Sequence, residues 1–247
     1  MQSKRKCCDM LKTITLQQGD FLKKNPFLLH FYYLKQNIPD GILYVDEENE
    51  NVAFYYAKEK EASVFCNDEK FMQDFFDLLP KGETHFQATN PFARDWLKKR
   101  CEFIWASDCN FFCYNGQPLP KPQHETGSLT SQHVNLVATG TSYQADLEEI
   151  AQAIETRPTS AIYVDQNPVC WCVTHTDYSM GMLYTLPNHR NKGYALSVML
   201  DIANKLIKSG VTPFCYIIEG NVASENLAKK YNMESLDKSF YFGIEKL

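Results

Sequence analysis

One order of elements occurs twice along this chain of 247 residues. Residues 41–56 and residues 160–173 each contain an apolar run ending in Tyr-Val-Asp, then a polar turn and a second apolar run, which predicts a β-hairpin in each half. In both halves a third apolar run follows, then a helical stretch, an extended stretch and a short helix that begins with Asn90 or Asn221. A series of matching elements on this scale restricts the chain to two related domains.

The alternation of strands with helices predicts the α+β class, with two tandem layered α/β domains that each hold a mixed, mostly antiparallel sheet flanked by helices. We place the domains at residues 1–115 and 131–247, because residues 116–130 are rich in Pro and Gly and are typical of a linker. In the second domain the pattern predicts strands near 132–139, 160–166, 168–175, 178–186, 212–218 and 239–245, and helices near 143–156, 194–209 and 222–231.

Composition limits the classes of function. The net charge of −5 argues against a protein that wraps nucleic acid. No apolar run is long enough to cross a membrane, and the basic start leads into no apolar signal core, so we expect a cytoplasmic protein without membrane or nucleic-acid partners.

The nine cysteines are an odd number, which favours reduced thiols over a disulfide framework. Cys170, Cys172 and His175 have the chemistry of metal ligands. An extended strand, however, places the two thiols on one side and His175 on the other. We therefore interpret the thiols as buried strand residues, and no metal site is predicted.

The second half carries 14 residues that the first half lacks, since Cys66 and Asn90 are 24 positions apart, whereas Leu183 and Asn221 are 38 apart. Within this stretch a strand runs into Pro187, and a short basic loop then leads directly into a helix. A helix start offers several backbone N–H groups and the positive end of the helix dipole. The pattern therefore predicts a site for a phosphate or a pyrophosphate.

Single residues of this loop fit the same prediction. Arg190 and Lys192 supply positive charge, Gly193 allows a tight turn and close approach of a ligand, and Ala195 leaves space on the first helical turn. The alternative is an ordinary strand–turn–helix connection whose Arg and Lys are simply solvated. The loop has neither the P-loop nor the dinucleotide-binding pattern, which disfavours nucleoside triphosphates and dinucleotides.

The pattern Arg-x-x-Gly-x-Ala at 190–195 resembles the coenzyme A pyrophosphate loop of the GNAT acyltransferase superfamily, and Asn221–Lys229 is similar to the second signature of that superfamily. Pro168–Trp171, Thr185–Pro187 and Lys205–Lys208 resemble the glycine N-acyltransferase-like branch in particular. In that branch the N-terminal half is built like a degraded copy of the C-terminal half. The likeness covers residues 142–247 well and the first half in outline.

The resemblance implies an acyl-CoA-dependent N-acyltransferase, with acetyl-CoA or another acyl-CoA as co-substrate and a small-molecule amine or amino acid as acceptor. Direct attack of the amine on the thioester is expected, without a metal. The acceptor, the acyl chain and the oligomeric state stay open. The first domain lacks the loop and is expected to be a degenerate copy that does not bind coenzyme A. The resemblance places coenzyme A against Leu183, Tyr184, Thr185, Arg190, Asn191, Lys192, Gly193, Tyr194, Ala195 and Asn221.

An attacking amine must lose its proton, so a general base is expected. The glycine N-acyltransferase-like branch has a carboxylate where this chain has Ser179. The resemblance also implies that the fourth strand of the domain splays away from the fifth and leaves a gap for the thiol arm of coenzyme A. We predict Glu219 as the replacement, because it follows the fifth strand and should lie at the mouth of this gap. Asp177 and His175 are the alternatives for the base, and a merely solvated Glu219 is the structural alternative.

Many members of the superfamily place a Tyr in the second short helix to protonate the departing sulfur. That position is Ala228 here, and Tyr231 lies one turn further on roughly the same face, so Tyr231 is the predicted acid. The departures at Ser179 and Ala228 also motivate a second hypothesis, a non-catalytic module that binds coenzyme A. A scaffold without any ligand is the third.

Overall fold

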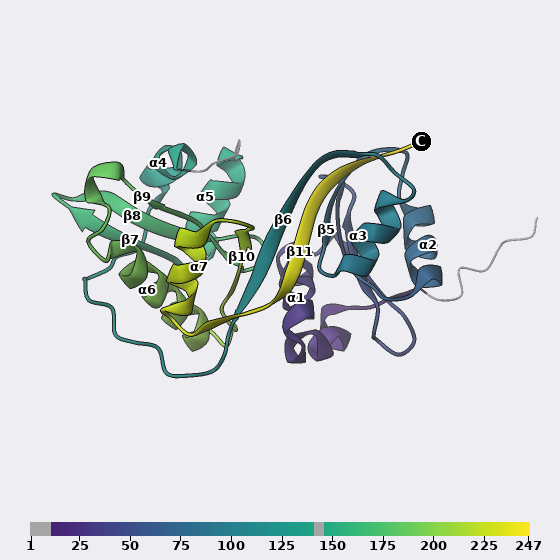
Figure 1. The fold of residues 1–247 in the computed structure, drawn as a ribbon, viewed down its shortest axis with the longest axis horizontal. Helices are drawn as coiled ribbons and strands as arrows, with labels where there is room; N and C mark the ends of the chain where they lie inside the picture. The colour runs from purple at the N-terminus through teal and green to yellow at the C-terminus, as the bar shows by residue number, and fades with distance from the viewer. Residues whose placement is uncertain (1–10, 141–145) are drawn as a thin grey trace, which may run out of the picture. The chain divides into compact units, whose positions relative to one another are not determined.

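Strands and helices alternate in the same order twice along the computed structural model, which describes residues 11–140 and 146–247 (Figure 1). The chain divides into two units. Unit 1 contains the residues up to Cys109 together with Lys238–Leu247, and unit 2 contains Asn110–Asp237. The predicted α+β class is confirmed, because sheets and flanking helices occur together in this chain.

The elements of unit 1, in chain order, are β1 (Lys12–Thr13), the 3-10 helices η1 (Leu16–Lys24) and η2 (Pro26–Leu28), α1 (Leu29–Asn37), β2 (Ile42–Val45), β3 (Val52–Tyr56), β4 (Glu61–Phe65), α2 (Glu69–Leu78), β5 (Gly82–Ala88), α3 (Pro91–Lys98), most of β6 (Phe103–Tyr114) and the last part of β11 (Met233–Lys246). Its sheet has the strand order β1-β2-β3-β4-β5-β11-β6. Strands β2, β3 and β4 are antiparallel neighbours, and β4 then pairs with β5 in parallel.

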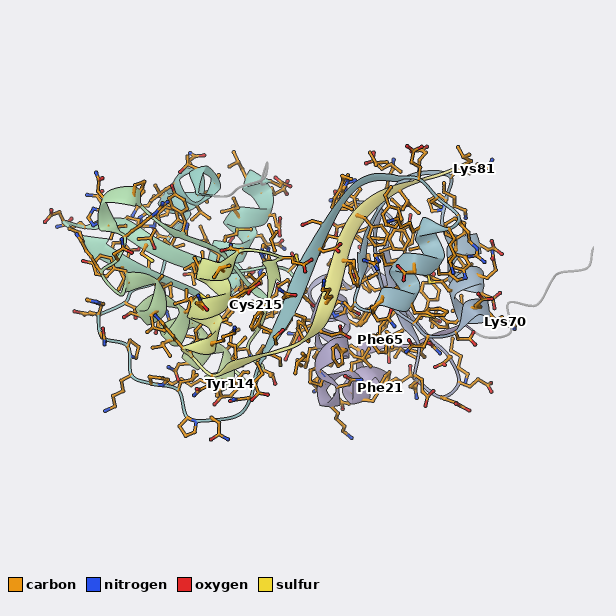
Figure 2. All side chains as sticks on the ribbon, in the orientation of Figure 1. Phe21, Phe65, Lys70, Lys81, Tyr114 and Cys215 are labelled. Carbon is orange, nitrogen blue, oxygen red and sulfur yellow. The ribbon has the colours of Figure 1, made fainter. Side chains whose placement is uncertain are left out.

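Helix α2 anchors the core of unit 1 through an apolar stripe. Phe71 and Phe75 lie one turn apart on this helix, and both are fully buried. They belong to the same cluster as Phe86 of β5 and Phe242 of β11, whose rings stack with centroids 5.6 Å apart. Because burial of one such ring stabilises the fold by about 1.5–3 kcal/mol, this cluster ties the helix to the sheet. Figure 2 shows Phe65, at the end of β4, among the side chains of this unit.

The elements of unit 2 are the 3-10 helix η3 (Ser131–His133), α4 (Val134–Thr139), α5 (Leu147–Thr156), β7 (Thr159–Val164), β8 (Asn167–Thr174), β9 (Met180–Thr185), the 3-10 helix η4 (Pro187–His189), α6 (Tyr194–Lys208), β10 (Phe214–Ile218), α7 (Val222–Lys229) and the first part of β11. Along α6, Val198, Ile202 and Leu206 recur every four residues and are fully buried.

Among the described residues no helix is both long and apolar enough to cross a membrane.

Unit 2 contains two separate groups of strands. β7, β8 and β9 form an antiparallel three-stranded sheet, whereas β10 is the neighbour of β6. Phe111 of β6 packs on β10, with its ring centroid 5.3 Å from that of Tyr216. Figure 2 labels Cys215, a buried residue of β10, among the side chains of this unit. Within the described residues β9 and β10 are therefore not joined by a ladder of hydrogen bonds.

The last strand of the chain completes the sheet of unit 1. Residues Phe240–Lys246 of β11 pair antiparallel with Ala88–Gly82 of β5. Because these residues pair with β5, Lys238–Leu247 belong to unit 1. Our predicted boundaries put them in the second domain. Residues 116–130, the predicted linker, hold no helix or strand and make one isolated β-bridge, between Gly127 and Ala161.

One predicted strand, at 132–139, is wrong, because this stretch forms η3 and α4. Val134 and Val137 are three residues apart, so a helix turns both toward the cluster around Trp171, and the capping box of Thr130 starts the turn. The valines favour a strand locally, but packing decides the outcome. The other elements predicted for the second domain are confirmed to within two residues, except that β11 begins earlier, at Met233, and that positions 143–145 lie outside the described residues.

His30 makes the stability of unit 1 depend on pH. Its side chain in α1 is 1% exposed, neither ring nitrogen has a hydrogen-bond partner among the described residues, and burial lowers its pKa to about 3. As the pH falls below the ordinary value of 6.5, the unfolded chain takes up a proton that the folded chain refuses, so stability is lost between pH 6.5 and about pH 3. From about pH 7.5 to about pH 5.5, the wild-type protein should lose about 1.4 kcal/mol more unfolding free energy than His30→Leu. Urea unfolding at both pH values measures this difference, and equal losses would contradict the prediction.

Candidate functional site

The chain bends sharply between β9 and α6. Pro187 opens η4, and two residues after it take left-handed backbone angles, Asn191 with φ 62° and Gly193 with φ 79°. Asn and Gly are the residues that accept this conformation at low cost. Gly193 is also the residue directly before α6, so the left-handed turn sets the direction in which the helix leaves the bend.

The bend leaves a row of backbone amides without partners. The first helical hydrogen bond of α6 runs from the Ser197 amide to the Gly193 carbonyl oxygen, over 3.2 Å. In the described parts of the chain, the amides of residues 191–196 donate to no acceptor, and no side chain caps this helix. Asn191, Lys192 and Gly193 are exposed. The bend is therefore open to an anion, which helix starts attract through their amides and their dipole.

Unit 1 treats the matching helix differently. Helix α2 begins directly after Asp68, whose carboxylate accepts a hydrogen bond of 2.7 Å from the Phe71 amide. The chain itself therefore supplies an anion at the start of α2. The corresponding start of α6 carries none, and its flanking charged residues, Arg190 and Lys192, are positive instead.

Strand β9 contains a bulge at the residues expected to face the co-substrate. Gly181 pairs with Val173 and Tyr184 with Trp171, so Met182 and Leu183 together oppose one residue of β8. Met182 takes a φ of 50°, which is strained for a side chain of this kind. Such a bulge twists and bends a strand, and β9 pairs with β8 alone among the described strands.

The equivalent strands of unit 1 are closed. β4 pairs in parallel with β5 up to Val64 opposite Ala88. At their ends, Asn90 donates 2.8 Å to the Cys66 carbonyl and accepts from the amide of Ala93. In unit 2, the matching Asn221 accepts a bond of 3.2 Å from the Ser224 amide and so caps α7 in the same way. Among the described residues, however, β9 and β10 do not pair with each other. The open edge of β9 is thus specific to the second copy.

The side chain of Arg190 fixes the bend to the end of β9. Its Nε donates 3.0 Å to the carbonyl oxygen of Thr185, and its guanidinium lies 5.7 Å from the centre of the Tyr184 ring. Thr185 in turn donates from Oγ1 to Sγ of Cys170, one of the two cysteines of β8 that the structure places in the core. The interpretation of Cys170 and Cys172 as buried strand thiols is confirmed.

Part of the predicted linker packs beside the bend, a contact that our sequence analysis did not predict. The amides of Gln123 and His124 both donate 3.2 Å to Oγ of Ser197, which is buried on α6. The His124 ring places Nε2 2.9 Å from the carbonyl oxygen of Lys192 and lies edge-on to the Tyr194 ring, with centroids 4.8 Å apart. These contacts hold one side of the bend while the residues 191–193 stay exposed.

The two residues predicted to act on protons lie in different surroundings. Glu219 is exposed and follows the last residue of β10, directly before Gly220, whose φ is 86°. Tyr231 is 2% exposed, and its amide bonds to the carbonyl of Ala228. Its hydroxyl oxygen lies 4.0 Å from Sγ of Cys215, and burial raises its pKa well above the ordinary value, so it keeps its proton at neutral pH.

The hydroxyl of Ser179, the residue for which the sequence resemblance led us to expect a carboxylate, donates 2.6 Å to Asp177. The Ser179 amide donates to the same carboxylate oxygen over 2.9 Å. Both side chains are buried, and burial raises the pKa of Asp177. Asp177 therefore holds the turn between β8 and β9 together.

Ser197→Ala should loosen the contact between the linker and α6. The change removes the acceptor shared by the Gln123 and His124 amides, and loss of a buried acceptor costs about 1–3 kcal/mol. We expect amide hydrogen exchange in residues 121–126 to become about five- to 150-fold faster. Ser209→Ala at the other end of α6, where Oγ bonds only within the helix end, is the matched control. Unchanged exchange in the Ser197 variant would contradict the assignment of this contact.

Comparison with known proteins agrees with this geometry. The model of the family described as FR47-like protein matches residues 162–242, which include β8, β9, the bend, α6 and α7. A Drosophila protein of known crystal structure is similar over 96% of this chain and 98% of its own, with a TM-score of 0.73 and 12% sequence identity.

Two solved acetyltransferase structures are similar as well. An acetyltransferase of the GNAT family from Colwellia psychrerythraea covers 95% of this chain, and the chain covers 99% of it, at a TM-score of 0.56 and 12% identity. A GCN5-related N-acetyltransferase from Sphaerobacter thermophilus covers 96% of this chain, and the chain covers 95% of it, at a TM-score of 0.56 and 10% identity. The chain therefore has the fold of the GNAT acetyltransferases.

Proposed function

We propose that this protein is an N-acyltransferase that transfers an acyl group, by default acetyl, from acyl-CoA to the amine of a small molecule or an amino acid. The observation that carries the proposal is the difference between the two copies. Among the described residues, a bend with unpaired amides next to a strand that lacks a partner on one side occurs in the second copy alone. The GNAT fold and the acetyltransferase names of its structural neighbours support the same function.

In this proposal the bend binds the diphosphate of coenzyme A. The amides of residues 191–196 donate no hydrogen bond to any described residue, and Lys192 adds positive charge at the same place. The exposed residues of the bend leave space for the ligand, and Gly193 brings the backbone close to it. Arg190 contributes in two ways: its hydrogen bond to the Thr185 carbonyl orients the bend, and its positive charge attracts the diphosphate.

The thiol arm of the co-substrate would lie along the free edge of β9, with the backbone of Leu183, Tyr184 and Thr185 as its partners. An edge strand offers unpaired N–H and C=O groups, and an amide-containing chain can pair with them as another strand would. Asn221, at the end of β10, is the proposed contact from the other side. An amide at the bulge of β9 would donate to the thioester oxygen as its negative charge develops.

The chemistry is direct aminolysis of a thioester. The amine nitrogen must be neutral, yet an alkylammonium has a pKa of about 10.4 and an α-ammonium about 8, so a base has to take its proton. The nitrogen then attacks the carbonyl carbon, and the carbon–sulfur bond breaks. Glu219 as base and Tyr231 as acid remain the sequence-based predictions. A thiolate with a parent pKa of about 8.5 leaves at neutral pH even without full protonation, so activity does not require Tyr231.

A non-catalytic module that binds coenzyme A is the second candidate function. Ala228 stands where we expected the Tyr of many superfamily members, and Ser179 where we expected the carboxylate of the glycine N-acyltransferase-like branch. Ala228 is fully buried, and Ser179 is bonded to Asp177. Measuring thiol release from acetyl-CoA with a panel of amines separates the two functions. Turnover with an amine supports the enzyme, whereas binding without turnover for every amine supports the module.

Gly193→Glu should abolish coenzyme A binding while the fold stays intact. The new carboxylate would stand at the bend and repel the diphosphate, so we expect the dissociation constant to rise at least tenfold, or about 1.4 kcal/mol. Isothermal titration calorimetry with coenzyme A measures the change.

Gly210→Glu is the matched control for this experiment. Gly210 has a φ of 75°, close to the 79° of Gly193, and lies at the far end of α6 with nothing within 4 Å of an added Cβ. The same backbone strain and the same charge are thus introduced away from the bend. Equal affinity of the two variants would remove the bend from the proposed site.

A further inference from the structure

The turn between β8 and β9 carries a histidine whose position depends on a glycine. His175 follows β8 directly, and its ring lies over Gly181 of β9, where a Cβ would collide with Nε2. The amide of His175 bonds to the Ser179 carbonyl over 2.9 Å, which fixes the backbone of the turn. Gly181 therefore provides the space in which the imidazole ring rests on the strand.

A carboxylate from α5 faces the other nitrogen of this ring. Oε1 of Glu149 lies 4.0 Å from Nδ1 of His175, and the two side chains are 36% and 32% exposed. The interaction with His175 lowers the pKa of Glu149, so this group is a carboxylate at neutral pH. A carboxylate beside Nδ1 favours the tautomer that leaves Nε2 free to accept a proton, and it stabilises the imidazolium that results.

The other charged groups around this pair are accounted for. Asp177, in the same turn, interacts electrostatically with His175, but its Oδ1 already accepts two hydrogen bonds from Ser179. Arg157, which follows α5, faces Glu149 and Asp177, and its Nε donates 3.1 Å to the Thr174 carbonyl. Burial raises the pKa of Asp177 and lowers that of Arg157. Of these groups, His175 is the one that is partly exposed and has a nitrogen, Nε2, that does not face its carboxylate partner Glu149.

The place of His175 along β9 suits a base. Gly181 comes two residues before Leu183, in the bulge proposed to hold the thioester oxygen. Two residues of a strand span roughly 7 Å, a distance that an amine nitrogen and one water molecule bridge. The exposed Glu219, in contrast, lies on the chain beyond β10, outside this sheet.

We propose that His175, oriented by Glu149, is the general base that deprotonates the acceptor amine. This inference rests on the proposed function. Nε2 takes the proton as the N–H bond of the ammonium breaks, directly or through one water, and the freed electron pair attacks the thioester carbon. The carbon–sulfur bond then breaks with its electron pair going to sulfur, and the imidazolium returns its proton to solvent. Glu149 is a positioning residue that stabilises the charged ring.

The test is the pH dependence of kcat/KM with acetyl-CoA and the best amine of the panel. In the wild-type protein kcat/KM should fall as the pH is lowered, along an acidic limb that reports protonation of the base. His175→Gln should lower kcat/KM about 100-fold and remove this limb, while calorimetry shows unchanged coenzyme A affinity. Glu149→Gln should keep the limb, shift it to lower pH and lower kcat/KM about tenfold, because the imidazolium loses its carboxylate.

A third variant reaches His175 without changing it. Gly181→Ala inserts a methyl group where the ring lies, so it should displace the imidazole and reproduce the loss seen in His175→Gln. His85→Gln in unit 1 and Glu148→Gln, the exposed neighbour of Glu149 on α5, are matched controls that should keep wild-type kinetics.

The outcomes separate this inference from the proposed function. If His175→Gln retains wild-type kcat/KM, or loses activity but keeps the acidic limb, His175 is not the base. Removal of the limb by Glu219→Gln instead would also overturn the inference and support Glu219. A wild-type protein that binds coenzyme A but transfers acetyl to no amine would overturn the enzymatic function and this inference together.

Discussion

The structure of the second copy depends on one missing ladder of hydrogen bonds. A strand edge with unpaired amides and carbonyls is costly unless something covers it, and in the first copy β5 covers the edge of β4. In the second copy the bulge at Met182 bends β9, and β9 and β10 belong to different sheets. The uncapped start of α6 lies directly beyond this strand. Among the described residues, the backbone groups that the first copy uses for its own stability thus stay without a partner in the second, where we propose that coenzyme A binds.

The two copies of the architecture differ in how their helix starts and strand ends are capped. Asp68 caps α2 from within the chain, and Asn90 links the ends of β5 and β4. Both devices close the first copy. In the second copy, fourteen additional residues include a left-handed bend and two cations, and Asn221 still caps its helix as Asn90 does. A duplicated fold can therefore retain one copy as a structural body while the other keeps an open backbone.

Local patterns in the sequence predicted much of this. The repeat, the helix at 194–208 and the bend before it follow from apolar spacing, from Gly193 and from Pro187, all of which act through neighbours in the chain. The strand predicted at 132–139 was wrong because tertiary packing of Val137 outweighs the strand preference of valine. The pairing of β11 with β5 and the contact of His124 with Lys192 join residues more than sixty positions apart, and no local pattern encodes them. The pair of His175 and Glu149 also depends on a glycine whose role is visible only in three dimensions.

The pairing of β11 with β5 has a consequence for the order in which the protein is built. Residues Phe240–Lys246 pair with β5 in a sheet whose other strands, apart from β10, all precede Asn115. During synthesis at the ribosome, unit 2 can therefore complete its fold while the sheet of unit 1 still waits for its last strand. We therefore expect unit 2 to fold before the sheet of unit 1 is complete, with the β5 edge exposed until Phe240–Lys246 have left the ribosome.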